Sequence, residues 1–302
     1  MSLRVLVRDE PDAPIDVLSA VDGVEVLRWT DAEHLPEGAD EVEVLVTNAT
    51  VADVDRLLPQ LPRLKLMQTL SAGVEQIEDH VPEGVLLSNA RGAHGGSTAE
   101  WAMAALLAVL RELPTFVRRQ DEGRWDQHMT DTLAGKRVLV LGAGDLAQEF
   151  RRRAEAFDAA VELVGRRARE GVHGMDELPT LLPQTDALLV VLPLSDSTRG
   201  IVDAELLARL PDGAVFVNAG RGPLVDTDAL LAELTAERLR AALDVTDPEP
   251  LPEDHALWSA PNVLVTPHVA GSTVGYEQRA WQVAAEQIAQ FAAGQDPDNR
   301  QG

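Results

Sequence analysis

The sequence predicts an α/β protein built from two doubly wound parallel-sheet domains. Short apolar runs alternate with helical patterns along almost the whole chain, and this alternation is typical of βαβ units. The runs are continuous stretches of Val and Leu, which favours strands that are buried on both faces. A long apolar helix separates the runs into two sets, and 302 residues are enough for two cores.

One set of predicted strands precedes this helix and the other follows it. The first set is Arg4–Val7, Val24–Trp29, Val42–Val46, Leu64–Thr69 and Val85–Ser88. The second set is Arg137–Leu141, Val161–Val164, Ala187–Leu192, Ala214–Val217, Leu239–Leu243 and Val263–Val265.

Two long helices mark where the chain passes between the domains. The first is predicted over Thr98–Arg119, and Pro114 should kink it or end its first segment. Because it is too long for an ordinary crossover, we expect it between the two domains. The second is predicted over Val274–Ala293, after the last strand, and should return to the first domain.

The expected division is therefore a substrate domain of residues 1–98 plus 272–302 and a dinucleotide-binding domain of residues 99–271. We expect the tail Gln295–Gly302 to be disordered. No apolar run approaches the roughly 18 residues of a membrane span. The first residues read as a strand rather than a signal peptide, so we expect a cytoplasmic protein.

The charge is strongly acidic. Asp and Glu number 50 against 26 Lys and Arg, a formal net charge of −24. Such a surface repels nucleic acid and anionic membranes. We interpret it as an adaptation to a high-salt cytoplasm, as in a halophile, and a merely acidic, arginine-rich proteome is the alternative. The chain has no cysteine, so disulfides and thiolate zinc sites are excluded, and we expect no metal site.

A glycine-rich turn follows the strand Arg137–Leu141. Gly142, Gly144 and Ala147 form a G-x-G-x-x-A pattern, and a helical pattern runs from Leu146 to Phe157. In this context the glycines let the backbone approach a pyrophosphate at the helix N-terminus. The pattern therefore predicts a dinucleotide site.

The next strand indicates which dinucleotide is bound. NAD enzymes usually end this strand with an acidic residue that holds the ribose 2′-hydroxyl. Here it ends in Gly165-Arg166-Arg167, without a carboxylate to repel a 2′-phosphate and with arginines suited to bind one. We therefore expect NADP(H) to be preferred over NAD(H).

Three later strands end in different reactive groups. Arg221 follows the strand Ala214–Val217, Asp244 and Glu249 follow Leu239–Leu243, and His268 follows Val263–Val265. Parallel sheets bind ligands beyond the carboxyl ends of their strands. If these strands are neighbours, an arginine, a carboxylate and a histidine meet where they can exchange a proton with an oxygen of an anionic substrate.

These motifs, in this order, resemble the D-2-hydroxyacid dehydrogenase family. The matching segments are Ser71–Val74, Leu133–Val138 with the glycine turn, Val191–Leu194, Val217–Gly222, Leu243–Pro250 and Thr266–Gly271. The resemblance implies a Rossmann cofactor domain inserted into a flavodoxin-like substrate domain. It also implies a homodimer, with contacts through the long apolar helix and an arm around Phe116–Met129. Gly165-Arg166-Arg167 is similar to the NADP-using glyoxylate/hydroxypyruvate reductases and 2-ketoacid reductases.

The expected reaction is the NADPH-dependent reduction of 2-ketoacids to D-2-hydroxyacids. The resemblance implies that Arg221, Glu249 and His268 are the catalytic set. His268 would donate the proton, Glu249 would hold the imidazole, and Arg221 would bind the carboxylate and polarise the carbonyl. Asp244 would tune this pair or orient the nicotinamide carboxamide.

The substrate carboxylate is also expected to bind backbone N–H groups of a loop in the first domain. This loop is Ser71, Ala72, Gly73 and Val74. The expected cofactor contacts are Gly142, Gly144, Asp145, Leu146, Gly165, Arg166, Arg167, Leu192, Pro193, Thr198, Ala219, Gly220, Asp244, His268 and Ala270. Candidates for the wall of the substrate pocket are Asn48, Thr50, Leu70, Ser71 and Trp281, and Trp281 is alternatively a core residue.

Two rival functions use the same motifs. The chain could be an NAD(P)H-sensing corepressor-like protein that binds peptides, although a complete set of proton-transfer residues disfavours pure sensing. It could also be a formate or phosphonate dehydrogenase on the same fold. A glutamate partner for the histidine, rather than a glutamine, favours the hydroxyacid chemistry.

Overall fold

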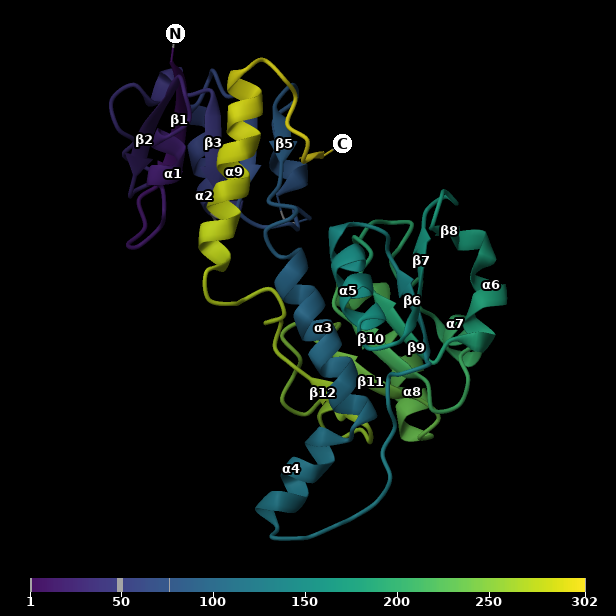
Figure 1. Ribbon diagram of the computed structural model, residues 1–302. Coiled ribbons are helices and arrows are strands. Elements are labelled where there is room, and N and C mark those ends of the chain that lie inside the picture. The colour runs from purple at the N-terminus through teal and green to yellow at the C-terminus, as the bar shows by residue number, and fades with distance from the viewer. Residues whose placement is uncertain (1, 48–50, 76, 302) are drawn as a thin grey trace. The chain divides into compact units, whose positions relative to one another are not determined.

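The computed structural model describes residues 2–47, 51–75 and 77–301, and it divides into two compact units (Figure 1). The first unit is Met1–His94 with Val274–Gly302, and the second is Gly95–Thr273. Each unit contains one sheet of parallel strands with helices on both faces. The predicted α/β class with two parallel-sheet domains is therefore confirmed.

The first unit has the strand order β13-β5-β4-β3-β1-β2. Its parallel strands are β1 (Leu3–Arg8), β2 (Val24–Trp29), β3 (Val44–Thr47), β4 (Leu66–Thr69) and β5 (Leu86–Ser88). Counted along the chain, the order is 2-1-3-4-5, which is the flavodoxin-like arrangement. Only β13 (Arg300–Gln301) is antiparallel among the described strands, and it pairs with β5 at the edge.

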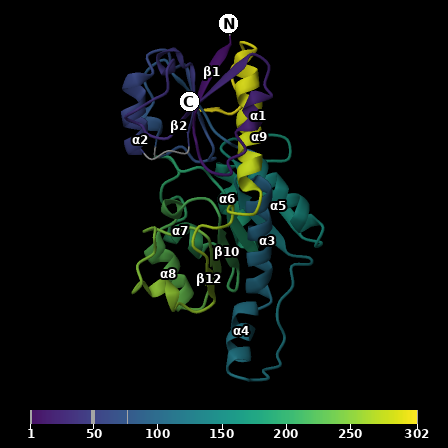
Figure 2. The same ribbon diagram turned by 90° about the vertical axis from the view of Figure 1, so that its left-hand side faces the viewer.

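Helices cover both faces of this sheet (Figure 2). On one face, α2 (Val51–Leu57) packs on Leu6, Leu45 and Met67. On the other, α1 (Asp16–Ser19) and α9 (Tyr276–Ala292) cover the alternate strand residues. Trp281 of α9 is 4% exposed within this layer and is a core residue. Short 3₁₀ helices lie at Ala39–Glu41, Leu58–Gln60 and Glu78–His80.

The second unit has the strand order β12-β11-β10-β9-β6-β7-β8. Its strands are β6 (Arg137–Leu141), β7 (Ala160–Gly165), β8 (His173–Gly174), β9 (Ala187–Val190), β10 (Val215–Asn218), β11 (Arg240–Leu243) and β12 (Val263–Val265). All are paired in parallel. Counted from β6, the order is 3-2-1-4-5-6 with one further strand, as in the Rossmann fold.

Helices form a layer on each face of the second unit's sheet (Figure 2). Alternate strand residues pack against one layer or the other. Val138, Val140 and Val215 face α3 (Gly95–Leu110) and α5 (Asp145–Glu155). Their neighbours Leu139 and Leu141 face the opposite layer. That layer consists of α6 (Leu178–Leu181), α7 (Ala204–Ala208) and α8 (Thr227–Thr235). Short 3₁₀ helices lie at Met175–Glu177, Leu182–Gln184, Gly222–Leu224 and Ala256–Trp258.

The predicted helix Thr98–Arg119 is two helices. After α3 ends at Leu110, Glu112 adopts a left-handed backbone conformation with φ of 52°, and α4 runs over Leu113–Asp121. Pro114 lies in the first turn of α4, where its missing N–H costs nothing. A continuous helix would press its ring against the carbonyl of Leu110. Helix α3 packs on α5 and β10 within the second unit.

The prediction of a disordered tail over Gln295–Gly302 is wrong for its described part, which ends at Gln301. This segment forms β13, and Asn299 within it is buried. Its polar composition suggested disorder, but the carbonyl groups that the Asn299 side chain binds lie some 200 positions earlier in the chain and leave no local signal. No described helix is both long enough and apolar enough to cross a membrane.

Candidate functional site

The candidate residues of the second unit share one edge of its sheet. Because all its strands are parallel, their carboxyl ends lie at this edge in the order β7, β6, β9, β10, β11 and β12. The expected adjacency of the last three strands is confirmed by their pairing. The loops that carry Arg221, Glu249 and His268 therefore follow neighbouring strands.

The glycine turn after β6 fits a pyrophosphate. Gly142 has φ of 135°, and a Cβ there would lie 2.7 Å from the Val191 side chain, so the turn requires glycine. Within the described residues, the backbone N–H groups from Ala143 to Ala147 donate to no protein acceptor. Unpaired N–H groups at a helix N-terminus attract anions. Gly144 and Leu146 thus have N–H groups without a protein acceptor, whereas the Asp145 carboxylate lies against Gly95 at the start of α3.

The end of β7 carries one arginine more than the prediction named. Gly165 is buried, and Arg166 and Arg167 are exposed. Arg169 donates from Nη2 to the carbonyl oxygen of Ala143, at 3.2 Å, in the glycine turn. A Cβ on Gly165 would lie 3.1 Å from Arg169 Nη1, so glycine leaves room for this side chain.

The loop after Arg167 turns back, and two backbone hydrogen bonds between Arg169 and Val172 close it. This turn brings Arg169 to the glycine turn after β6. The run of arginines in the sequence could have indicated Arg169 as a third phosphate-binding candidate. Its position, however, depends on the turn that Arg169 and Val172 close. Three guanidinium groups therefore belong to the loop that follows β7.

The loops after β9 and β10 contact each other. Thr198 Oγ1 donates to the carbonyl of Pro193, at 2.8 Å, and closes the β9 loop. A Cβ on Gly220 would lie 3.1 Å from the carbonyl oxygen of Leu192. Ala219 N–H donates to Val190 O. The predicted residues of these two loops thus form a continuous surface beside the glycine turn.

Arg221 is fixed by the loop that carries it. Asn218 is buried, and its side chain donates to the Arg221 carbonyl at 3.0 Å and accepts from Gly220 N–H at 3.1 Å. The next residue, Gly222, packs so closely on the carbonyl of Thr246 that any Cβ would overlap it. This contact holds the arginine loop against the loop that leads to Glu249.

His268 and Glu249 form the pair that the sequence predicted. His268 Nδ1 lies 2.5 Å from Glu249 Oε1, and the two side chains are 50% and 40% exposed. Within the described residues, no hydrogen bond or ion pair joins the other ring nitrogen, Nε2, to a protein group. The imidazole is therefore oriented at one nitrogen and accessible at the other, which suits proton transfer to a bound molecule.

Asp244 holds the histidine loop. The residue is 3% exposed, and its carboxylate accepts from Thr266 Oγ1 at 2.5 Å, Val269 N–H at 2.9 Å and Ala270 N–H at 2.8 Å. His268, between these donors, has φ of 54°, an uncommon conformation for a residue with a side chain. The contacts of Asp244 to protein are thus to the loop around His268, and its predicted contact with the cofactor stays a prediction.

The Ser71–Val74 loop belongs to the first unit, where its carbonyl groups are bound inward. Asn89 Nδ2 donates to the Ala72 carbonyl at 2.7 Å, Ser71 Oγ donates to the Gly73 carbonyl at 2.6 Å, and Ala90 N–H donates to the Ser71 carbonyl at 2.9 Å. Among the described residues, the N–H groups of Ala72, Gly73 and Val74 have no acceptor. Adjacent free N–H groups suit a small anion such as a carboxylate.

Of the candidates for the pocket wall, Asn48 and Thr50 lie outside the described residues. Leu70 is half-buried beside the core of the first unit. Trp281 is buried in that core, as the alternative assignment had it.

The sequence and the fold both match known proteins. The family model described as the D-isomer specific 2-hydroxyacid dehydrogenase, NAD binding domain, matches residues 103–270. The D-3-phosphoglycerate dehydrogenase of Methanocaldococcus jannaschii is 31% identical over 98% of this chain, which spans only 59% of that protein. The glyoxylate/hydroxypyruvate reductase A of Arabidopsis thaliana is 32% identical over 82% of each chain.

A solved structure gives the same result. The D-isomer specific 2-hydroxyacid dehydrogenase of Xanthobacter autotrophicus Py2, in complex with NADPH and MES, has a TM-score of 0.85 and 33% identity. The match covers 100% of this chain and 98% of that one. The chain belongs to the D-isomer specific 2-hydroxyacid dehydrogenase family.

Proposed function

We propose that this protein reduces 2-ketoacids to D-2-hydroxyacids with NADPH, in a reversible reaction. The observation that carries the proposal is the His268–Glu249 pair, with Nδ1 bound and Nε2 accessible, at the sheet edge that also bears the dinucleotide turn. A proton donor beside a dinucleotide site is what carbonyl reduction requires.

The catalytic residues have separate tasks in this proposal. The bound dinucleotide supplies the hydride. His268 donates the proton to the carbonyl oxygen from Nε2, and Glu249 keeps Nδ1 engaged, which fixes the ring and stabilises its charged form. Arg221 binds the substrate carboxylate and stabilises negative charge as it develops on the carbonyl oxygen. The N–H groups of the Ser71–Val74 loop are a second candidate site for the carboxylate.

The preference for NADPH rests on the loop after β7. Arg166 and Arg167 are exposed, Arg169 lies at the glycine turn, and Gly165 contributes no carboxylate. Guanidinium groups bind phosphate in bidentate geometry, and the Xanthobacter relative was solved with NADPH. Replacing Arg169 with Ala should raise KM for NADPH about tenfold and leave KM for NADH unchanged, because only NADPH has a 2′-phosphate.

A substrate panel tests the proposed reaction. Oxidation of NADPH and of NADH is followed with glyoxylate, hydroxypyruvate, pyruvate and longer 2-ketoacids at low and molar KCl. We expect turnover with at least one 2-ketoacid and a higher kcat/KM with NADPH than with NADH. No turnover with any of them would refute the reductase, and a clear NADH preference would refute the cofactor assignment.

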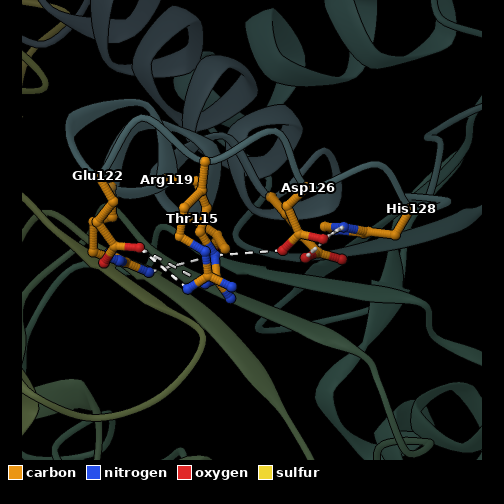
Figure 3. A network of polar contacts seen from close by, with 8 residues as sticks. Thr115, Arg119, Glu122, Asp126 and His128 are labelled. Carbon is orange, nitrogen blue, oxygen red and sulfur yellow. Dashed lines mark hydrogen bonds and ion pairs between the residues drawn. The ribbon is translucent and has the colours of Figure 1, made fainter.

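We also propose a homodimer that forms through the arm of the second unit. Figure 3 shows how polar contacts shape this arm: Arg119 pairs with Glu122 and Asp126, at 3.8 and 3.4 Å. His128 pairs with Glu112, at 3.1 Å, and stacks on Phe116. The arm is thus held in one shape by its own residues.

The apolar side chains of the arm face solvent in the single chain. Leu113 and Val117 are 51% and 58% exposed, and Trp125 and Met129 are 95% and 96% exposed. Apolar groups grouped on a structured arm favour burial against another surface, and we assign that surface to a second copy of the chain. Sedimentation should give a dimer for the native protein and a monomer for Trp125→Ser with Met129→Ser; a native monomer would refute the assignment.

The acidic composition bears on the salt concentration at which the protein works. With a net charge of −24, the folded chain repels itself at low salt, where the Debye length is long. We propose that the enzyme works in a salt-rich cytoplasm. Its unfolding midpoint should rise between low and molar KCl, and a midpoint that does not change with KCl would refute this.

A further inference from the structure

A buried asparagine joins the C-terminal segment to the strand β5. Asn299 is 6% exposed, and its side-chain amide donates to two carbonyl oxygens, those of Asn89 at 3.1 Å and Arg91 at 2.9 Å. In return, the backbone N–H of Asn89 donates to the carbonyl of Asn299, at 3.3 Å. Asn89 is therefore bound to Asn299 in both directions.

Asn89 also binds the Ser71–Val74 loop. It is 5% exposed, and its side-chain Nδ2 donates to the carbonyl of Ala72 at 2.7 Å, while its Oδ1 accepts from Arg91 N–H at 3.1 Å. The carbonyl of Ala72 belongs to the peptide that supplies the Gly73 N–H. The orientation of that peptide, and of the N–H group it presents, depends on the bond from Asn89.

Helix α9 fixes the other end of the connection. Gln287, 4% exposed, accepts from the backbone N–H of Asn299 at 2.8 Å. One turn on, Gln290 exchanges two hydrogen bonds with Asp298, at 2.8 and 2.9 Å. Asn299 is thus held by a helix, and a buried amide in a satisfied network has one preferred position.

We propose that Asn299 is a positioning residue for the Ser71–Val74 loop and acts through Asn89. The C-terminal segment braces the backbone N–H groups of Ala72 to Val74 in the arrangement that receives a substrate carboxylate. This inference rests on the proposed function only in naming the carboxylate as the ligand of the loop. The brace itself is a property of the first unit.

The test compares Asn299→Ala with a change elsewhere in the same segment. Asp296→Asn is the matched control, because Asp296 forms an exposed ion pair with Arg300 and does not contact Asn89. In Asn299→Ala, KM for the best 2-ketoacid should rise roughly five- to tenfold, the effect of weakening one or two hydrogen bonds. Turnover at saturating substrate and the Kd for NADPH should stay unchanged. Asp296→Asn should leave all three values unchanged.

A double-mutant cycle tests the route through Asn89. Asn89→Ala should raise KM to a similar extent, and the double variant should be no worse than the more severe single variant, because both changes break one chain of contacts. Additive effects on KM would overturn the route. An unchanged KM in a fully folded Asn299→Ala protein would overturn the positioning role.

Amide hydrogen exchange separates this inference from the proposed reaction. The backbone N–H of Ala90, which donates to the carbonyl of Ser71, should exchange faster in Asn299→Ala than in the native chain, while the segment around β1 should not change. If the native protein reduces no 2-ketoacid, the proposed function fails, and the exchange of Ala90 still decides whether the brace exists. Unchanged exchange of Ala90 would overturn the inference.

Discussion

A comparison of two of the histidine–glutamate pairs in the second unit shows what makes one of them a candidate for catalysis. His268 Nδ1 lies 2.5 Å from Glu249, and His173 Nδ1 lies 2.8 Å from Glu177. In the His173 pair, the second ring nitrogen also faces a carboxylate, Glu162, at 3.5 Å. Within the described residues, Nε2 of His268 has no hydrogen-bond or ion-pair partner in the protein.

Their places in the fold explain the difference. His173 and Glu177 lie four positions apart in the chain, His173 in the edge strand β8 and Glu177 in the 3₁₀ helix that follows it. His268 and Glu249 come from loops after β12 and β11. These loops lie at the same edge of the sheet as the loop of Arg221 and the glycine turn after β6. A histidine–glutamate contact is therefore not a site by itself. Such a contact is a candidate site where it lies at the carboxyl ends of parallel strands and where one ring nitrogen remains available to a substrate.

The largest effect should come from removing His268. We expect His268→Ala to lower kcat about 10²- to 10⁴-fold, the usual contribution of a general acid, with NADPH binding retained. His173→Ala is the matched control and should leave kcat unchanged. Steady-state kinetics and NADPH titration measure both. An unchanged kcat in His268→Ala would remove His268 from the mechanism.

A smaller effect should follow when the loop that positions His268 is loosened. Asp244→Asn keeps the shape of the side chain but removes its charge and one acceptor, so either Val269 N–H or Ala270 N–H loses a bond to a carboxylate. Such bonds contribute about 1.5–3 kcal/mol, so kcat should fall roughly ten- to a hundredfold.

A graded control sharpens that comparison. Thr266→Val removes a single donor to Asp244 and should lower kcat less than Asp244→Asn does. The two variants are compared by kcat and by unfolding midpoint. Equal kcat values in native and Asp244→Asn protein would show that the His268 loop keeps its position without the carboxylate.

The smallest effect concerns the stability that the His173 pair supplies. The hydrogen bond to Glu177 raises the pKa of His173 above its ordinary 6.5, and the bond to Gly174 N–H, followed by His173, lowers the pKa of Glu177 below 4.5. The histidine contribution is complete below pH 6.5 and is lost as pH rises through the raised pKa. The glutamate contribution is complete above pH 4.5 and is lost as pH falls through its lowered pKa.

The pair should therefore stabilise the fold between these limits. Native protein should unfold at a slightly higher temperature than His173→Gln near pH 6, and the difference should vanish by about pH 9. Thermal unfolding at both pH values measures it. A difference that persists at the higher pH would mean that the neutral imidazole, and not its charge, supplies the stability.

Much of the second unit could be predicted because its chemistry follows its strands. The apolar runs that became β6 and β12 have the predicted bounds, and Gly142, Arg221 and His268 stand just beyond strand ends. A parallel sheet brings such positions to one edge whatever the detailed packing. Helix α4 was less predictable, because the break before it lies at Glu112 and not at the proline.

The sequence by itself determined the α/β class and the glycine turn and marked the candidate reactive side chains, because periodicity, glycine spacing and strand ends are local properties. Only the tertiary structure decided that Arg169 reaches Ala143, that Asp244 holds the His268 loop, and that Asn299 binds Asn89. These are hydrogen bonds between segments far apart in the chain. Their geometry depends on how whole strands and helices pack, so it cannot be predicted from any short stretch of sequence.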